Sequence, residues 1–134
     1  MTDFAVDPVI VSLTRKLADW PLSRLFLYND SRYQWGLLVP RRPGVVEMCD
    51  LPVQDQQQLM AEIVQLSNLI RPLPGVEKLN VGNLGNMVTQ LHVHVIGRYK
   101  GDPAWPGPVW GHSDPKPWPD PATAPLSLAV EKGR

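Results

Sequence analysis

"QLHVHVIGR" (residues 90–98) carries two of the chain's three histidines in an alternating polar and apolar run. Alternation with a period of two predicts a strand, because successive side chains of a strand point to opposite faces. On this interpretation Gln90, His92 and His94 share one face, while the apolar residues between them pack on the other. The run therefore predicts a row of amide and imidazole groups on a backbone that a sheet holds in place.

Three roles remain open for such a row. It can be a solvated strand face without chemistry. It can supply two ligands to a metal, although a catalytic zinc needs a third. The other candidates are His112, Cys49 or a distant carboxylate, and none of them has diagnostic spacing. In the third role one histidine attacks phosphorus, because imidazole is neutral and nucleophilic near pH 7.

Length and composition narrow the class of protein. A chain of 134 residues is long enough for one domain with a real core. Lys plus Arg equals Asp plus Glu, at 13 each, so no broad basic face for nucleic acid is expected. The single Cys49 excludes an internal disulfide and fits a reducing compartment. With no apolar run long enough to span a membrane, we expect a soluble cytoplasmic protein with neither nucleic acid nor membrane as a partner.

The N-terminal half predicts a helix followed by a hairpin. Asp7 and Pro8 read as an N-cap and a first helical residue, and apolar residues recur at helical spacing over residues 8–18. Trp20-Pro21 would end this helix. Residues 22–28 and 33–39 read as strands joined by the polar turn 29–31, which predicts an antiparallel pair.

The middle of the chain predicts a long helix and a second strand pair. One apolar stripe runs along residues 51–70, and Pro72 and Pro74-Gly75 end the helix. Residues 76–81 then read as a strand, 82–86 as a Gly/Asn-rich turn, and 87–96 as the strand that carries the histidines. Strand pair, helix and strand pair together predict an α+β domain in which one helix covers a sheet face.

The C-terminal part differs in composition. Most of the chain's 15 prolines and three of its 5 tryptophans follow residue 100, and residues 101–125 lack any helical or strand period. Linkers are poor in aromatic residues, so we expect an ordered, extended arm that lies over the domain or over a partner. The residues after Pro125 are expected to be loose.

The histidine run resembles the signature of the histidine triad (HIT) superfamily, His-φ-His-φ-His-φ-φ with φ apolar, but with Gln90 in the first position. Its surroundings follow the order found in the family. A Gly/Asn-rich turn precedes the run, Gly97-Arg98 follows it, and the earlier segment 37–44 is similar to the family's φ-φ-φ-P…R-P. The resemblance covers residues 20–100. It implies a HIT-like α+β fold, with an antiparallel meander sheet, one main helix packed on it and a short N-terminal helix. The domain would span residues 1–100, and the Pro/Trp-rich arm 101–134 would belong to the same domain.

The resemblance also implies an activity. Members of this family are typically homodimers that bind purine nucleotides and act on an α-phosphate. The substrate would be an adenylylated compound, such as a dinucleoside polyphosphate or a nucleoside phosphoramidate. His92 would attack phosphorus to form a nucleotidyl-histidine intermediate, which water then hydrolyses. His94 would contact the phosphate and help to organise His92.

Other site residues follow from the same resemblance. The catalytic set would be Gln90, His92 and His94, and the nucleotide-binding set Asn86, Asn29 and Asp30. No protein-bound cofactor or metal is expected, while Mg²⁺ would accompany a polyphosphate substrate.

Two departures from the family pattern leave alternatives open. Gln90 cannot donate a proton as an imidazolium does, although its amide can bind a phosphate oxygen. Trp35 stands where some members have another histidine, which removes a possible relay. A non-catalytic nucleotide-binding regulatory protein with the same fold is the main alternative, and a metal-dependent hydrolase is the third.

Overall fold

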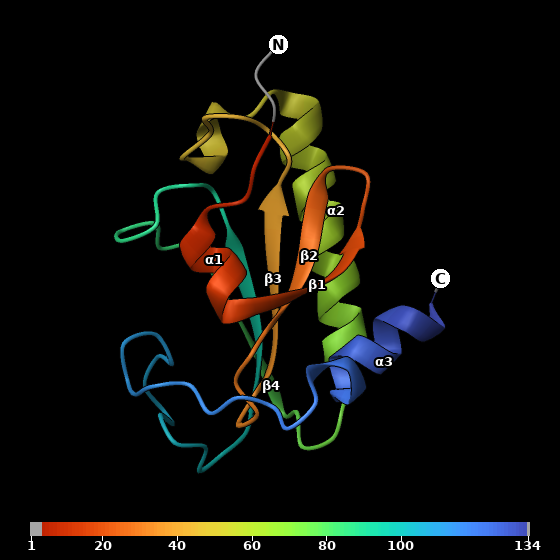
Figure 1. Cartoon of the computed structure of the whole chain (residues 1–134), viewed down its shortest axis with the longest axis vertical. Helices are drawn as coiled ribbons and strands as arrows, with labels where there is room; N and C mark the ends of the chain where they lie inside the picture. Colours follow the sequence, from red (N-terminus) through yellow and green to blue (C-terminus); the bar gives the residue numbers. More distant parts are fainter. Residues whose placement is uncertain (1–3, 134) are drawn as a thin grey trace.

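The computed structural model describes residues 4–133 (Figure 1). In chain order its main elements are α1 (Pro8–Leu13), β1 (Thr14–Asp19), β2 (Ser23–Tyr28), β3 (Gln34–Pro40), α2 (Val53–Ile70), β4 (Lys78–Gly82), β5 (Val93–Arg98) and α3 (Pro125–Lys132). Two short 3-10 helices, η1 (Met48–Asp50) and η2 (Pro121–Thr123), precede α2 and α3. None of the helices in this part of the chain is long and apolar enough to cross a membrane.

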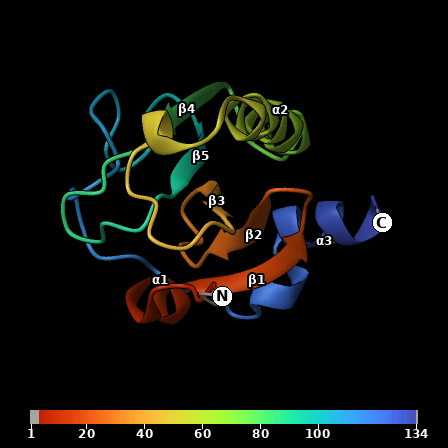
Figure 2. The same ribbon diagram turned by 90° about the horizontal axis from the view of Figure 1, so that it is seen from above.

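All five strands form one antiparallel sheet in the order β1-β2-β3-β5-β4. The first three strands are a meander. The chain then crosses through α2 to β4 at the far edge and returns as β5 beside β3. Seen from above, α2 and α3 lie on one side of the sheet, and α1 and the loops around the site lie on the other (Figure 2). The predicted α+β class and antiparallel sheet are confirmed.

The main core lies between the sheet and α2. The predicted helical stripe supplies Leu59, Ile63, Leu66 and Ile70, all buried, and strands β2, β3 and β5 face it with Leu25, Leu27, Leu38, Val93 and Val95. Helix and sheet approach closely because β3 and β5 carry a glycine at the contact. A Cβ on Gly36 would lie 2.8 Å from a methyl group of Leu66. Burial of this apolar area is the main stabilising term.

The opposite face of the sheet is covered in two parts. Near α1, Ile10 packs on Phe26, Leu37 and Val39. Beside them, Tyr33, Trp35 and Ile96 pack on Val109 from the C-terminal arm. Period-two alternation along β3 and β5 puts His94 and Arg98 on this second face, with the aromatic residues and not with α2.

The predicted helix over residues 8–18 is wrong in its second half. α1 ends at Leu13, and the chain continues as β1, whose Leu17 is buried in the core. The Thr14 hydroxyl donates to the carbonyl of Ile10, 2.7 Å away, at the end of the helix. A helix of six residues is marginal alone, and pairing with β2 outweighs the local 3.6-residue period.

The predicted strand over residues 87–96 begins later than its alternation indicates. β5 starts at Val93, so Gln90 and His92 precede the strand. Strand β4 ends at Gly82, which pairs with His94, and the pairing of β5 with β3 ends where Val93 meets Leu38. One backbone hydrogen bond, from the Leu91 amide to the Val45 carbonyl, and side-chain hydrogen bonds of Asn83 and Gln90 hold that segment instead.

The expectation of a loose tail after Pro125 is also wrong. Residues Pro125–Lys132 form helix α3, with Pro125 in its first turn. Leu126 and Val130, one turn apart, are buried in the main core together with Ala124. A buried apolar pair at helical spacing stabilises the end of the chain.

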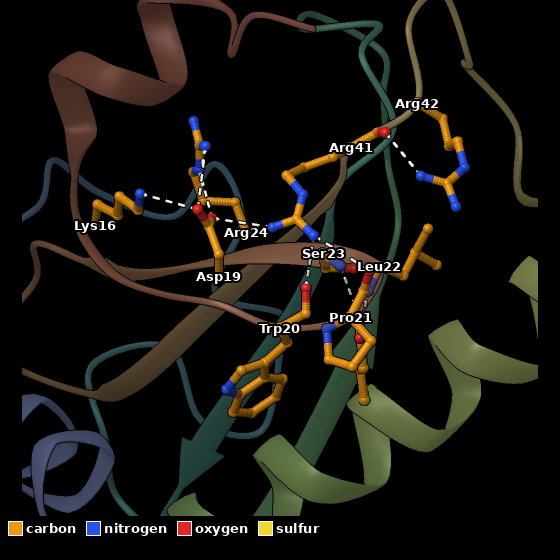
Figure 3. A network of polar contacts seen from close by, with 10 residues as sticks. Lys16, Asp19, Trp20, Pro21, Leu22, Ser23, Arg24, Arg41 and Arg42 are labelled. Carbon is orange, nitrogen blue, oxygen red and sulfur yellow. Dashed lines mark hydrogen bonds and ion pairs between the residues drawn. The ribbon is translucent and has the colours of Figure 1, made fainter. Parts of the chain in front are cut away.

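The turn between β1 and β2 is held by a surface charge cluster (Figure 3). Asp19 accepts from Lys16 and Arg24 at 3.1 and 2.7 Å, and Arg41 lies 3.2 Å away. Arg41 also donates to the carbonyl of Trp20 at 2.8 Å, which ties the end of β3 to this turn. The Arg24 guanidinium holds the pKa of the Asp19 carboxyl below its usual range.

Candidate active site

A cavity of about 460 Å³ opens on the sheet face opposite α2, and both histidines of the run line it. Its walls come from three parts of the chain: the sheet, the loop before β5 and the C-terminal arm. The lining residues are Tyr28, Asp30, Trp35, Leu84, Gly85, Asn86, Met87, Val88, His92, His94, Val109, Trp110, Gly111, Ser113 and Pro115. A mostly apolar cavity with a few convergent polar groups is the usual form of a small-molecule site.

His92 is oriented by the backbone just before it. Its Nδ1 lies 2.7 Å from the carbonyl oxygen of Gln90. A carbonyl only accepts, so Nδ1 carries a proton, and in the neutral ring Nε2 has the lone pair. In the described part of the chain Nε2 has no hydrogen bond, and it is not among the polar atoms buried without a partner. Nε2 of His92, which lines the cavity, is therefore open to a bound molecule.

The backbone around His92 is fixed although it lies outside the sheet. The Leu91 amide donates to the carbonyl of Val45 at 3.0 Å, and Asn83 Nδ2 donates to the carbonyl of His92 at 2.8 Å. These contacts replace the missing strand pairing. The backbone is consequently held both just before His92 and at its own carbonyl, as a precise site requires.

His94 has the opposite proton arrangement. Trp35 Nε1 donates to its Nδ1 over 3.0 Å, so the ring proton of neutral His94 lies on Nε2. Burial, and the neighbouring His92, lower the pKa of His94 to about 3. The two imidazole rings meet edge to face, with centroids 5.2 Å apart. One cavity thus holds an imidazole with a free lone pair beside an imidazole with a free N–H.

Gln90 does not share this face. Its Oε1 accepts from the Asp7 amide and its Nε2 donates to the carbonyl of Ala5, both at 2.8 Å. The side chain ties the N-terminal segment to the loop, and Gln90 lines a separate, smaller cavity. The expected row of three polar groups is therefore reduced to two, because the strand begins only at Val93.

The three residues expected to bind nucleotide lie in different places. Asp30 is buried and lines the cavity, with both carboxylate oxygens bound by Arg32 at 3.0 and 2.9 Å. Asn86 lines the cavity at its exposed rim. Asn29 is not among the lining residues: its Oδ1 accepts from the backbone amide of Trp118 at 2.9 Å and so anchors the arm.

The arm closes one wall of the cavity. Trp110 stacks its ring edge against His94, with centroids 5.5 Å apart. Its indole lies so close to β4 that a Cβ on Gly82 would come within 2.6 Å of it. Arg32 donates to Ser113 Oγ at 2.7 Å and to the carbonyl of Asp114 at 2.9 Å. The proline-rich segment is thus ordered against the site.

The charge of the lining is low. Asp30 is its one carboxylate, and no Lys or Arg lines the cavity. In residues 4–133 no group of three or more His, Cys, Asp or Glu side chains is arranged to hold a metal ion. Of the metal candidates in the sequence, Cys49 is exposed, and His112 is exposed and contacts Ser113.

The model of the HIT domain matches residues 11–101, more than half of the chain. The chain belongs to the histidine triad (HIT) family. No curated protein gives a significant match.

Three solved structures of HIT proteins resemble the chain over nearly its whole length. The protein from Bradyrhizobium japonicum is 39% identical, with a TM-score of 0.92 and coverage of 98% of both chains. Those from Sinorhizobium meliloti (37%) and Marinobacter aquaeolei (41%) each have a TM-score of 0.91. They cover 98% of this chain and 97% and 96% of their own. The likeness therefore includes the C-terminal arm and α3, beyond the HIT match.

Sequence reasoning missed several residues of this HIT site. Tyr28, Val109 and Trp110 line the cavity, and Trp35 contacts His94 directly. Trp35, expected only to remove a possible relay, also donates its indole N–H to Nδ1 of His94. Leu37 pairs with His94 across the strands, so Trp35, two residues before Leu37, lies on the same face. The strand register was the signal that could have found it.

Proposed function

We propose that this HIT protein is a nucleotide-binding hydrolase or nucleotidyl transferase that acts on the α-phosphate of an adenylylated substrate. The observation that carries the proposal is the complementary proton arrangement of the two histidines. His92 offers an Nε2 lone pair to phosphorus, and His94 offers an Nε2–H to a phosphate oxygen. Nucleophile and donor are then present in one cavity before substrate binds.

The proposed reaction has two steps. In the first, Nε2 of His92 attacks the α-phosphorus, the N–P bond forms, and the bond from phosphorus to the leaving group breaks. The imidazole is cationic at that stage, and the Gln90 carbonyl stabilises its Nδ1–H. In the second, water attacks phosphorus, the N–P bond breaks, and a nucleoside monophosphate leaves. The leaving amine takes its proton from solvent in the first step, and the attacking water returns one proton to solvent in the second, so His92 ends neutral. The protein side of this chemistry uses no bound metal; Mg²⁺ would come with a polyphosphate substrate.

The lining favours one of the two substrate kinds. A dinucleoside polyphosphate brings several additional negative charges, which proteins usually bind with Lys or Arg. The cavity has no such side chain and one carboxylate, Asp30. A nucleoside phosphoramidate carries a single negative phosphate and releases an amine. We therefore propose nucleoside phosphoramidates as preferred substrates over diadenosine polyphosphates, with Asp30 and Asn86 in reach of the nucleotide.

A homodimer is part of the proposal. β4 is an edge strand, and unpaired edges are templates for association. Exposed apolar residues lie beside it and on α2, among them Val81, Met60 and Val64. Sedimentation of the full chain at micromolar concentration should give about twice the monomer mass, and a monomer would reject this part alone.

A substrate panel tests the activity. Wild-type protein is incubated with adenosine phosphoramidate, diadenosine tetraphosphate and an aminoacyl adenylate, and products are measured by mass spectrometry. We expect AMP, fastest from the phosphoramidate. His92→Ala should lose turnover but bind AMP, while the control His112→Ala, an exposed histidine outside the lining, should keep both. Binding of AMP without turnover of any substrate would favour the non-catalytic alternative.

A further inference from the structure

The contact between Trp35 and His94 joins two neighbouring strands. Trp35 lies on β3 and His94 on β5, and both side chains are buried, at 4% and 7% exposure. Indole Nε1 and imidazole Nδ1 are 3.0 Å apart. No other hydrogen bond of the His94 ring occurs within residues 4–133, so this contact alone sets its proton arrangement there.

The chemistry of the two rings makes the contact directional. An indole N–H can only donate, so Nδ1 of His94 must accept. Protonation of Nδ1 would place two N–H donors face to face in a buried site and would lose the bond. A histidine at position 35 could donate or accept, and would allow the partner to switch. Tryptophan allows one state only.

The Trp35 ring is also prevented from turning away. Tyr28 stacks on it at 3.9 Å between centroids with 15° between the planes. Tyr33 meets it edge-on at 6.0 Å and 85°. Such packed aromatic contacts fix the direction of the N–H bond. The donor therefore points at His94 whether or not substrate is present.

We propose that Trp35 is a positioning residue, which keeps His94 uncharged with its proton on Nε2 and thus makes His94 a fixed hydrogen-bond donor to the reacting phosphate. This inference rests on the proposed function. It assigns His94 no role as an acid that gives up its proton during turnover. The neutral donor stabilises the developing charge without a titration step of its own.

The surroundings of His94 agree with an uncharged ring. The titratable side chains around the cavity are His92 from the loop and Tyr28 and Asp30 from the end of β2 and its turn; the arm contributes the neutral Trp110. Both carboxylate oxygens of Asp30 are bound by Arg32. No free carboxylate of the lining faces His94 to stabilise a cation.

The test uses the free full-length protein and NMR of the histidine ring nitrogens between pH 5 and 9. In wild type, His94 should show an unprotonated Nδ1 and a protonated Nε2 throughout. Trp35→Phe keeps the aromatic stack and the burial of His94 but removes the donor, and should give a mixture of the two neutral tautomers in this range. Trp35→His restores a ring N–H and should recover the wild-type pattern in part. Tyr33→Phe keeps the ring edge against Trp35 and should change nothing.

Turnover of a nucleoside phosphoramidate gives a second readout. Trp35→Phe should lower kcat by about 10- to 100-fold with KM changed by less than about threefold, and Trp35→His should regain part of kcat. Absence of turnover in wild type would remove the proposed function and leave the NMR test valid. A wild-type His94 with a protonated Nδ1, or one that titrates near pH 6.5, would overturn the inference even if no variant folds. So would a Trp35→Phe protein with unchanged tautomer and kcat.

Discussion

At the scale of single residues, the site depends on which ring nitrogen carries each proton. His92 donates from Nδ1 to a backbone carbonyl, and His94 accepts at Nδ1 from an indole. The carbonyl can only accept and the indole N–H can only donate, so the tautomers of the two neutral rings follow from hydrogen-bond chemistry. In the proposed reaction, this pair supplies the attacking nitrogen and the N–H donor without a third histidine.

His94 should make stability depend on pH. Its pKa falls from 6.5 in the unfolded chain to about 3 in the fold, because burial penalises the charged ring. Between these values the unfolded chain binds the extra proton, so stability is complete above pH 6.5 and is lost as pH falls toward 3. The slope is on the order of 1.4 kcal/mol per pH unit. The unfolding free energy is measured in urea from pH 7 to 4. Its slope against pH should be shallower for His94→Asn than for wild type, and the same as wild type for His112→Asn. Equal slopes for all three proteins would contradict the assignment.

Gln90 should act through the loop and not on the substrate. Gln90→Ala removes two hydrogen bonds to the N-terminal segment and should cost about 1–3 kcal/mol in urea unfolding. Turnover should fall by about tenfold or less, because the carbonyl that orients His92 belongs to the backbone and remains. Gln90→Glu keeps the acceptor for the Asp7 amide and should be milder. A Gln90→Ala protein of wild-type stability that lost about 1,000-fold in kcat would instead place the amide on the phosphate.

At the scale of elements, the sequence was sufficient to predict a helix or strand where its hydrophobic period matched the face that is buried in the fold. The stripe of α2 and the strands β2 and β3 were predictable within a few residues, because local pattern and burial coincide there. α1 and β1 were not, since the spacing that includes Leu17 fits a helix while pairing with β2 makes a strand. The histidines were found from the motif, but Gln90 was misplaced, because alternation cannot tell where β5 loses its partner.

The contact between β4 and the arm can be tested at Gly82. A Cβ there would meet the Trp110 ring at 2.6 and 2.9 Å, so Gly82→Ala should push the indole out of the cavity wall. We expect a loss of about 1–3 kcal/mol in unfolding free energy, a shift in tryptophan fluorescence and weaker AMP binding. Lys78→Ala, at an exposed position of the same strand, is the control. Unchanged fluorescence and binding would show that Trp110 does not depend on Gly82.

At the scale of the whole molecule, one buried ion pair joins the sheet to the arm. Arg98 at the end of β5 binds Asp102 through Nε and Nη2 at 2.7 and 2.9 Å, and also binds Asn80 Oδ1 and the carbonyl of Gly107. Both charged side chains are essentially inaccessible to solvent. The arm is thereby attached where the sheet ends, beside the cavity that it walls.

Breaking this pair should loosen the arm. Asp102→Asn leaves the Arg98 charge buried without its carboxylate and should cost about 3–5 kcal/mol in urea unfolding. Limited proteolysis should then cleave the 101–115 segment faster than in wild type. The control is the same substitution at the half-exposed Asp19, which pairs with Arg24. Asp19→Asn should lower the unfolding free energy by about 1 kcal/mol or less. Equal costs for the two variants would contradict a structural role for the Arg98–Asp102 pair.

The most direct test of the whole account is the covalent intermediate. Wild-type protein is mixed with adenosine phosphoramidate, quenched in alkali within the first turnover, digested and analysed by mass spectrometry, with His112 as the internal control. The account predicts an adenylyl group on His92 alone, attached through nitrogen, and its absence in His92→Ala. Turnover without any adduct, or an adduct on His94 in place of His92, would contradict it.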